Sequence, residues 1–557
     1  MKETFFRSMT WLHTWVGLLV CWILLLVFFA GTASYYRHEI SLWTKPEIHK
    51  DVFQTYQTGN LARQLQEGQA YLSTHAKNAK DWRINFPTER KPYLSYGWQT
   101  QAKTGERRGQ FIEHIAHRDG QGMVTDVRDS RGGNFFYRLH FDLHYMPAKI
   151  ARWVVGFCTM FMLLALISGI VIHKRIFKDF FSFRRNKGGR SWLDAHNVSS
   201  VLALPYHLMI TYTGLITLML MYMPWGVMTA YDGDVRAFRA ELKPGREQVA
   251  LSGTTAPLIQ LSRLLPVVKA NWGDTPIKQV VISNINDENS RISFYKNTQQ
   301  SVTDLRIPLV FSGVSGERLS QAFTPPSAAH ATHDTLMSLH TARFAEPVLR
   351  FFFFICGLMG CAMIATGTLL WAVKIRQKQQ KLIKQGNKAS LGLRLVEGLN
   401  LTFIAGLPLA TCAFFYANRV LPPHMADRAQ WEVHSFFAVI VLTAILAYFD
   451  LSLKSWRRVL GLSALGFMTI PLLNWATSSQ HLFQNIASQQ WALVGFDLLC
   501  LLIGVTLWFA RVKLAQTDVE PSNRIAARAA SSSNGKRGPA ASPSLSHDPE
   551  QSAKEGA

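Results

Sequence analysis

Eight long apolar runs constrain the fold of this chain more than any other feature of its sequence. The first, Trp11 to Tyr36, has about 26 residues, enough to cross a hydrocarbon core of roughly 30 Å with some tilt. It has no small-residue cleavage site, so we interpret it as a retained helix and not as a signal peptide. The other seven runs occupy residues 150–173, 197–223, 347–373, 395–416, 432–451, 457–475 and 489–510. We therefore predict an integral membrane protein, an all-α bundle of about eight transmembrane helices.

The positive charge of the chain lies mainly in short segments beside these runs. The formal net charge is +23, which in a soluble protein would suggest a nucleic-acid partner. Residues 173–190 and 374–394, however, hold seven Lys or Arg each, and Arg511 and Lys513 follow the last run. The positive-inside rule places such segments in the cytoplasm, together with both termini. We therefore expect an N-in/C-in protein whose basic loops contact membrane lipid, and no nucleic-acid partner.

Two long segments, 37–149 and 224–346, project to the opposite side. Each is long enough for a small domain, and each opens with a helix-like stretch followed by strand-like runs. We predict a small α+β domain in each. Residues 395–510 form a C-terminal four-helix membrane region whose role the sequence leaves open. The Ser-, Ala-, Pro- and Gly-rich residues 516–557 are typical of a disordered tail.

The stretch 191–222 is apolar, yet it contains His196 and His207. The two are 11 residues apart, so on a helix they lie within about 20° of one another. Ionisable groups inside a bilayer cost free energy and usually mark a pathway or a bound cofactor.

An internal repeat gives these histidines counterparts. Aligned without gaps, the first helix of each half carries a histidine a fixed distance before a glycine, and the second helix of each half does so nearly as well. The spacings are 18 residues for His13–Gly31 and for His196–Gly214, 29 for His140–Gly169 and 27 for His340–Gly367. The first half of the chain therefore reads as a twice-repeated unit of helix, outer domain and helix.

A two-fold arrangement of these units would bring His13 to face His196 near the cytoplasm, and His140 to face His340 near the outer surface. Two neutral imidazoles on opposite sides of an iron are what bis-histidine haem ligation requires. All six cysteines lie in apolar runs, and the chain has no CxxCH motif, so such haems would be non-covalent. We predict two b-type haems, with haem iron bound through His13, His196, His140 and His340.

Two further histidines remain open as cofactor ligands. His207 is the deepest, and its repeat counterpart is Leu24; it could replace one symmetric ligand, or hydrogen-bond a haem propionate or a quinone. His173 ends the second run beside Lys174 and could be an alternative inner ligand, or a solvated histidine at a helix end.

Four stretches resemble the PepSY-associated transmembrane family, in which PepSY-type outer domains alternate with helices. They are MTWLHTWVGLL (9–19), RLHFDL (138–143), GIVIHKRIFKDFFSFR (169–184) and SWLDAHNVSSVLALPYHLMITYTGL (191–215). The resemblance covers about residues 1–375 and extends only loosely to the last four helices. It implies a bacterial inner-membrane protein with two PepSY-like periplasmic domains. Members of the family include haem b reductases that act on ferric siderophores in iron uptake.

We therefore expect transmembrane electron transfer through haem b to a ferric siderophore or another periplasmic ferric complex. The catalytic residues are unknown from sequence. The short cytoplasmic loops carry no GxGxxG or comparable phosphate loop, so the electron donor would be a quinol, a flavin or a separate reductase protein. Two alternatives stay open: a non-enzymatic, membrane-anchored PepSY protein that binds or regulates partners, and a solute permease.

Overall fold

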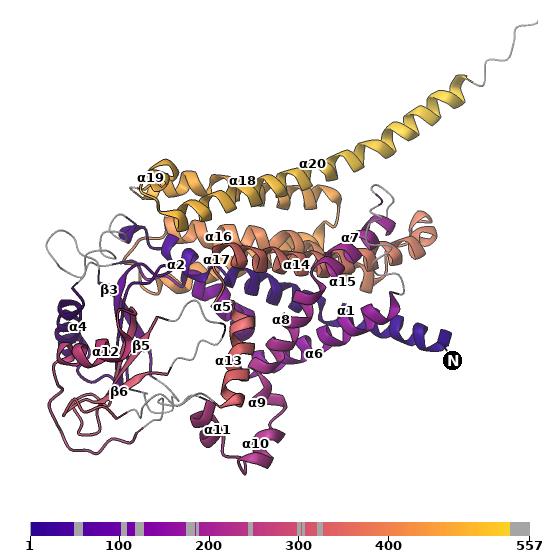
Figure 1. The fold of residues 1–557 in the computed structure, drawn as a ribbon. Coiled ribbons are helices and arrows are strands. Elements are labelled where there is room, and N and C mark those ends of the chain that lie inside the picture. The colour runs from indigo at the N-terminus through magenta and orange to yellow at the C-terminus, as the bar shows by residue number, and fades with distance from the viewer. Residues whose placement is uncertain are drawn as a thin grey trace, which may run out of the picture.

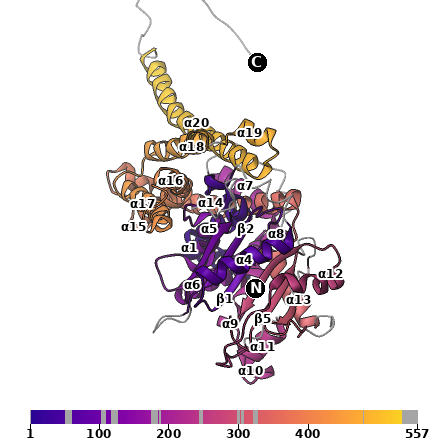
Figure 2. The same cartoon turned by 90° about the vertical axis from the view of Figure 1, so that its left-hand side faces the viewer.

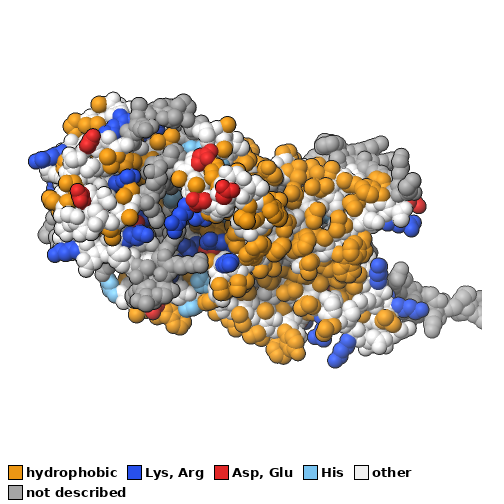
Figure 3. Space-filling model, turned by 90° about the horizontal axis from the view of Figure 1, so that it is seen from below, with side chains coloured by type: hydrophobic (Ala, Val, Ile, Leu, Met, Phe, Trp, Pro, Cys, Tyr) orange, Lys and Arg blue, Asp and Glu red, His pale blue; other side chains and the backbone are white. Residues whose placement is uncertain are grey.

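The computed structural model describes residues 2–49, 60–101, 109–116, 127–173, 184, 189–242, 249–297, 302, 307–319, 327–478 and 480–534. Helices form an elongated bundle, and a β-sheet lies at one end of it (Figure 1). Among the described residues, seven helices are long and apolar enough to cross a membrane. Apolar side chains dominate the surface of the bundle, whereas Lys and Arg gather beyond its two ends (Figure 3). The predicted fold class, a helical membrane bundle with α+β insertions, is confirmed.

Three long helices form the first half of the bundle: α1 (Lys2–Ser34), α6 (Ala148–Ile172) and α14 (Pro347–Lys384). They are apolar around most of their circumference, as helices surrounded by lipid and by one another require. α1 packs against both α6 and α14. It runs from the end far from the sheet, where the N-terminus lies, toward the sheet (Figure 1).

The predicted third span, 197–223, is divided into three helices: α7 (Gly189–Leu202), α8 (Leu204–Thr217) and α9 (Met219–Tyr222). The first break falls at Ala203, and Pro205 lies in the first turn of α8. Proline has no backbone N–H and its ring crowds the preceding turn, so the helix breaks just before it. None of the three pieces alone reaches the length of a membrane span, which is why seven spanning helices are found where we expected eight.

The C-terminal membrane region packs beside this half (Figure 2). Its first span joins α15 (Leu391–Asn400) to α16 (Gly406–Val420) through a π-helical turn, Leu401–Ala405. The other helices are α17 (Arg428–Phe449), α18 (Leu453–Thr477), the short α19 (Leu482–Ala487) and α20 (Trp491–Asn534). α20 thus continues into the segment that we expected to be disordered, while residues 535–557 lie outside the described part of the chain.

The two outer segments contribute three strands each. The first supplies β1 (Asp81–Asn85), β2 (Leu94–Gln99) and β3 (Phe111–Ala116). The second supplies β4 (Ile277–Ser283), β5 (Arg291–Lys296) and β6 (Leu309–Ser312). The helices of the first segment are α2 (Arg37–Trp43), η1 (Pro46–Ile48), α4 (Leu61–His75) and α5 (Gly132–Asp142). Those of the second are α10 (Trp225–Ala230), α11 (Val235–Leu242), η3 (Leu261–Leu264), α12 (Leu265–Trp272) and α13 (Ala328–Thr341).

All six strands join in one antiparallel sheet of order β3-β2-β1-β4-β5-β6. The order is symmetric about the β1–β4 pair, in which Asn85 lies opposite Gln279. Leu65 of α4 and Leu265 of η3–α12 bury their side chains in one core on this sheet with residues of both segments. The two segments that we predicted as separate α+β units therefore share a single sheet and a single core, with the repeat axis between β1 and β4.

Candidate functional site

The first histidine pair, His13 of α1 and His196 of α7, lies in the part of the bundle far from the sheet. The two ring centroids are 6.3 Å apart, and the ring planes are 70° from parallel. The Nδ1 atom of His13 lies 2.8 Å from the carbonyl oxygen of Ala165, and that of His196 lies 2.8 Å from the carbonyl oxygen of Met363. A carbonyl can only accept, so each Nδ1 carries the proton and each Nε2 keeps a free lone pair.

The second pair, His140 of α5 and His340 of α13, lies at the sheet end of the bundle. Its ring centroids are 5.9 Å apart and its planes are 36° from parallel. His140 Nδ1 donates to the carbonyl oxygen of Val27 at 2.7 Å, and His340 Nδ1 lies 3.1 Å from the hydroxyl of Thr213. Burial lowers the pKa of His140, and burial with the nearby His140 lowers that of His340 to about 3, so both rings are neutral at pH 7.

Each of the four rings lies against a glycine of another helix. A Cβ atom built on the glycine would come 2.7 Å from the ring of His140, and 3.2 Å from the rings of the other three histidines. The contacts are Gly31 with His140, Gly214 with His340, Gly169 with His13, and Gly367 with His196. Within each repeat the histidine near the start therefore lies against a glycine of the last helix, α6 or α14, and the histidine of the short helix before it, α5 or α13, lies against a glycine of the first span. These reciprocal contacts give the repeated spacings in the sequence a physical cause.

The ring spacing of both pairs matches that of two imidazoles on one iron. A metal–imidazole bond is about 2 Å and the ring centroid lies about 1 Å beyond the nitrogen, so two axial imidazoles have centroids about 6 Å apart. The Nδ1 hydrogen bonds are the outer contacts that usually fix a ligating histidine in orientation and tautomer. Within the described residues, no group of three or more His, Cys, Asp or Glu could hold a metal ion. Two ligands per site suit a metal whose remaining ligands come from a macrocycle.

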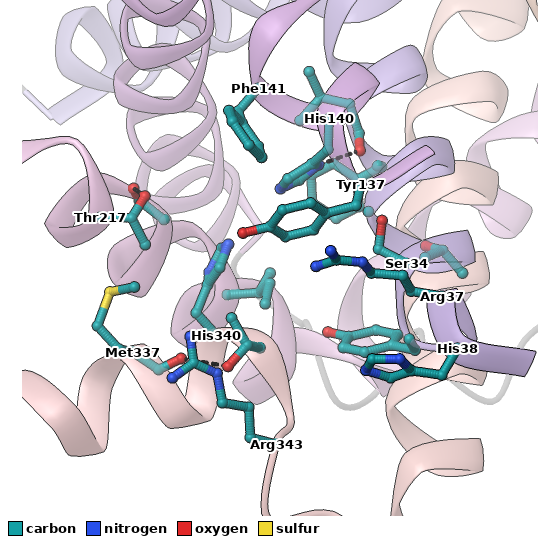
Figure 4. Close-up of a pocket in the computed structure, with 18 of the residues that line it drawn as sticks. Ser34, Arg37, His38, Tyr137, His140, Phe141, Thr217, Met337, His340 and Arg343 are labelled. Atoms are coloured by element: carbon teal, nitrogen blue, oxygen red, sulfur yellow. Dashed lines mark hydrogen bonds between the residues drawn. The ribbon is translucent and has the colours of Figure 1, made fainter. Parts of the chain in front are cut away.

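A cavity of about 770 Å³ joins the His140–His340 pair to the sheet. Both imidazoles point into it from different helices, with Tyr137 and Arg37 alongside (Figure 4). Its far wall includes Asn85 of β1. A space of this volume is in the range of small-molecule binding sites, roughly 300–1,000 Å³.

Residues 10–374 match the family described as PepSY-associated TM region. The chain belongs to the PepSY-associated transmembrane family. The family match includes both histidine pairs and their four glycines, and it ends before α15. No curated protein matches the chain.

The structure of this PepSY-associated transmembrane protein places the remaining two candidate histidines outside the pairs. His207 of α8 is fully buried, and neither of its ring nitrogens has a hydrogen-bond partner. Its aromatic neighbour on α1 is Phe28, at 6.3 Å between centroids. His173 directly follows α6, and its Nδ1 is buried without a partner. Four of the six predicted ligands thus meet in two pairs, and His207 and His173 join neither.

Our sequence reasoning missed the cationic side chains around the cavity of this family member. Arg37, Arg90 and Lys278 line it, although they are far apart in the sequence. The fold brings them together from α2, which carries Arg37, from the connection between β1 and β2, which carries Arg90, and from β4, which carries Lys278. The only indication of this in the sequence was the internal repeat, which relates the two outer segments to one another.

Proposed function

We propose that this protein is a haem b oxidoreductase of the bacterial inner membrane. It would carry electrons across the bilayer to a ferric complex, such as a ferric siderophore, on the periplasmic side. The observation that carries the proposal is the presence of two histidine pairs, each with iron-ligand spacing, at two depths of one bundle. When bound, a haem at each pair would supply a one-electron carrier.

The depths of the two pairs support a route across the membrane. His13 belongs to the first pair, and Gly31, on the same helix, contacts His140 of the second. Eighteen residues of α-helix correspond to about 27 Å, close to the thickness of the hydrocarbon core. One pair would therefore lie near each face of the bilayer.

The residues of the chain would set the properties of each site. The carbonyl groups of Ala165, Met363 and Val27 hold three of the four imidazoles with Nε2 directed away from the hydrogen bond. Hydrogen bonds from a ligating histidine to a carbonyl increase the basicity of the ligand and so lower the iron potential. Apolar side chains of α1, α6 and α14 pack in one core between the two pairs.

The open cavity at the sheet end supports the proposal that the ferric complex is reduced on the periplasmic side. A ferric complex entering it would reach the edge of the His140–His340 pair. Reduction of Fe(III) to Fe(II) weakens binding by hard oxygen ligands, so the iron would leave its chelate. The electron donor stays open between a quinol, a flavin and a separate reductase protein.

The test is to purify the protein in detergent after expression with an adequate haem supply. We expect a b-type spectrum, two haems per chain by pyridine haemochrome, and reoxidation of the reduced protein by a ferric chelate with Fe(II) released to a ferrous trap. His196→Ala should lose one haem and keep the other, whereas His424→Ala, in an exposed loop, should keep both. A colourless wild-type protein would overturn the proposal and favour a membrane-anchored binding protein.

A further inference from the structure

The cavity beside the His140–His340 pair is lined by an unusual set of charges. Six of its described lining residues are Lys or Arg, and none is Asp or Glu. The six are Arg37, Arg90, Lys91, Arg152, Lys278 and Arg343. They come from both repeat units, so the positive charge surrounds the cavity and is not confined to one wall.

Acidic partners compensate some of these cations, but from behind the cavity wall. Arg90 binds Glu39 at 3.0 Å, Lys91 binds Glu113 at 2.5 Å, and Arg152 binds Asp142 at 2.9 Å. None of the three carboxylates lines the cavity. In these ion pairs it is therefore the cation, and not the carboxylate, that reaches the cavity and can contact a ligand.

Arg37 is held in place by neutral groups. Its Nε donates to the side-chain oxygen of Asn134 at 2.5 Å, and its guanidinium lies over the ring of Tyr137 at 4.3 Å. These contacts orient the guanidinium and do not neutralise it. Figure 4 shows it directed toward the space between Tyr137 and His38.

His38 also lines the cavity and lies among these cations. Its pKa is well below the ordinary histidine value because of burial and because of the charges of Arg90, Arg37, Lys91 and Lys278. Four cations thus act on one side chain that itself lines the cavity. A buried site with one sign of charge and low-dielectric walls concentrates ligands of the opposite charge.

We propose that this cavity binds its ferric substrate as an anionic chelate, one with oxygen donors such as carboxylates and a net negative charge. The proposal rests on the proposed function and names the substrate class of that same site. Arg37, Arg90 and Lys278 contact the oxygens of the chelate, because Arg and Lys are the donors suited to carboxylates. Asn85 and Gln279, hydrogen-bonded to one another at 2.6 Å on the central strands, close the far side.

A haem at the His140–His340 pair would bring two propionate carboxylates, and these compete for the same cations. Two carboxylates can engage only part of a set of six. The haem-loaded protein is therefore the form to test, since it shows whether positive charge remains for a second anion.

The test is calorimetric binding of gallium(III) chelates to the purified haem-loaded protein, because Ga(III) resembles Fe(III) in its ligands but is not reduced. Gallium citrate, an anionic chelate, is expected to bind about tenfold more tightly than the cationic gallium complex of desferrioxamine B. Its affinity should fall between 50 mM and 500 mM NaCl. Equal affinity for the two chelates, or no binding of gallium citrate, would overturn the proposal.

Variants locate the site. Lys278→Gln and Arg343→Gln, both in the lining, should weaken gallium citrate about threefold to tenfold and leave the haem spectrum unchanged. Lys269→Gln makes the same change of charge at an exposed position of α12, outside the cavity lining, and should bind as the wild type does. Equal effects of Lys278→Gln and Lys269→Gln would overturn the assignment. Because gallium accepts no electron, a failure of electron transfer leaves this measurement intact, and the two proposals can fail separately.

Discussion

His13 and His196 stand ring to ring, with centroids 6.3 Å apart, although one belongs to the first helix of the chain and the other to α7. Each is fixed by the helix that closes its own repeat unit: His13 by Ala165 of α6, and His196 by Met363 of α14. The pair therefore depends on four helices at once. Any shift of one repeat unit relative to the other would change the distance between the rings.

The close contact of Gly31 with His140 predicts a specific effect of adding one methyl group. In Gly31→Ala the new Cβ would lie 2.7 Å from the imidazole, so the ring must move and its hydrogen bond to Val27 must change. We expect this variant to lose the haem at the His140–His340 pair and to retain the other, as measured by haem per chain. Gly17→Ala on the same helix meets nothing within 4 Å and should keep both. Equal haem content in the two variants would contradict the role of the contact.

Replacing His207 tests whether a buried histidine outside the two pairs is a haem ligand. It is fully buried, but its nearest aromatic neighbours are Tyr206, at 5.9 Å between ring centroids, and Phe28, at 6.3 Å, and not another histidine. The equivalent position in the first repeat is Leu24, so His207→Leu makes the two units alike. We expect this variant to retain two haems per chain with an unchanged b-type spectrum. Loss of a haem would show that His207 is a ligand and would require a new assignment of the pairs.

The pairing of histidines could be predicted from sequence because helices of fixed geometry carry the repeat. The spacing from His13 to Gly31 is preserved from His196 to Gly214, and a two-fold arrangement then leaves few ways to combine the four histidines. The sheet could not be predicted in the same way. Whether Asn85 pairs with Gln279 depends on two segments nearly 200 residues apart, and strand patterns do not encode their partner. The cationic cavity takes Lys278 from β4, Arg37 from α2 and Arg152 from α6, so it too appeared only in the structure.

The break in the third span had a different origin. By hydropathy, the apolar run 197–223 is long enough for one membrane-spanning helix, but hydropathy carries no information on backbone geometry. Pro205 removes one backbone donor and ends the helix near Ala203. The break separates His196, on α7, from His207, on α8, so the common helical face that first linked them does not exist in the folded chain.

A buried ion pair anchors the C-terminal region to the sheet side of the bundle. Arg428 and Glu432 are 1% and 0% exposed and lie 2.6 Å apart. Glu432 also accepts from Ser130, just before α5, and from Asn418 of α16. Glu432→Ala would leave Arg428 buried without its charged partner, although it still donates to the carbonyl oxygens of Asp129 and Asn418, at a cost of about 3–5 kcal/mol. We expect a clear loss of thermal stability in detergent.

Two controls make that prediction specific. The double variant Arg428→Met/Glu432→Leu removes both charges and should recover most of the lost stability, since apolar replacement of a buried pair is often neutral. Glu397→Ala breaks a pair with Arg376, which is 50% exposed, and should cost less than about 1 kcal/mol. A double variant as unstable as the single one would contradict the argument.

The ion pair of Glu113 and Lys91 predicts how the sheet responds to acid. Burial alone would raise the pKa of Glu113, but the charges of Lys91 and Lys45, with hydrogen bonds from Lys91 and Ser95, outweigh it and lower the pKa to about 2. A carboxyl whose pKa is depressed on folding stabilises the protein above its ordinary pKa near 4.5. That stabilisation is lost as the pH falls from about 4.5 toward 2. Glu113→Gln should lower the Tm at pH 7 by roughly 3 °C and flatten the decline of Tm below pH 5. Glu67→Gln alters the exposed i,i+4 pair with Arg63 on α4 and should keep the wild-type dependence of Tm on pH. If Glu113→Gln also kept the wild-type dependence, the Glu113–Lys91 pair would contribute little to stability.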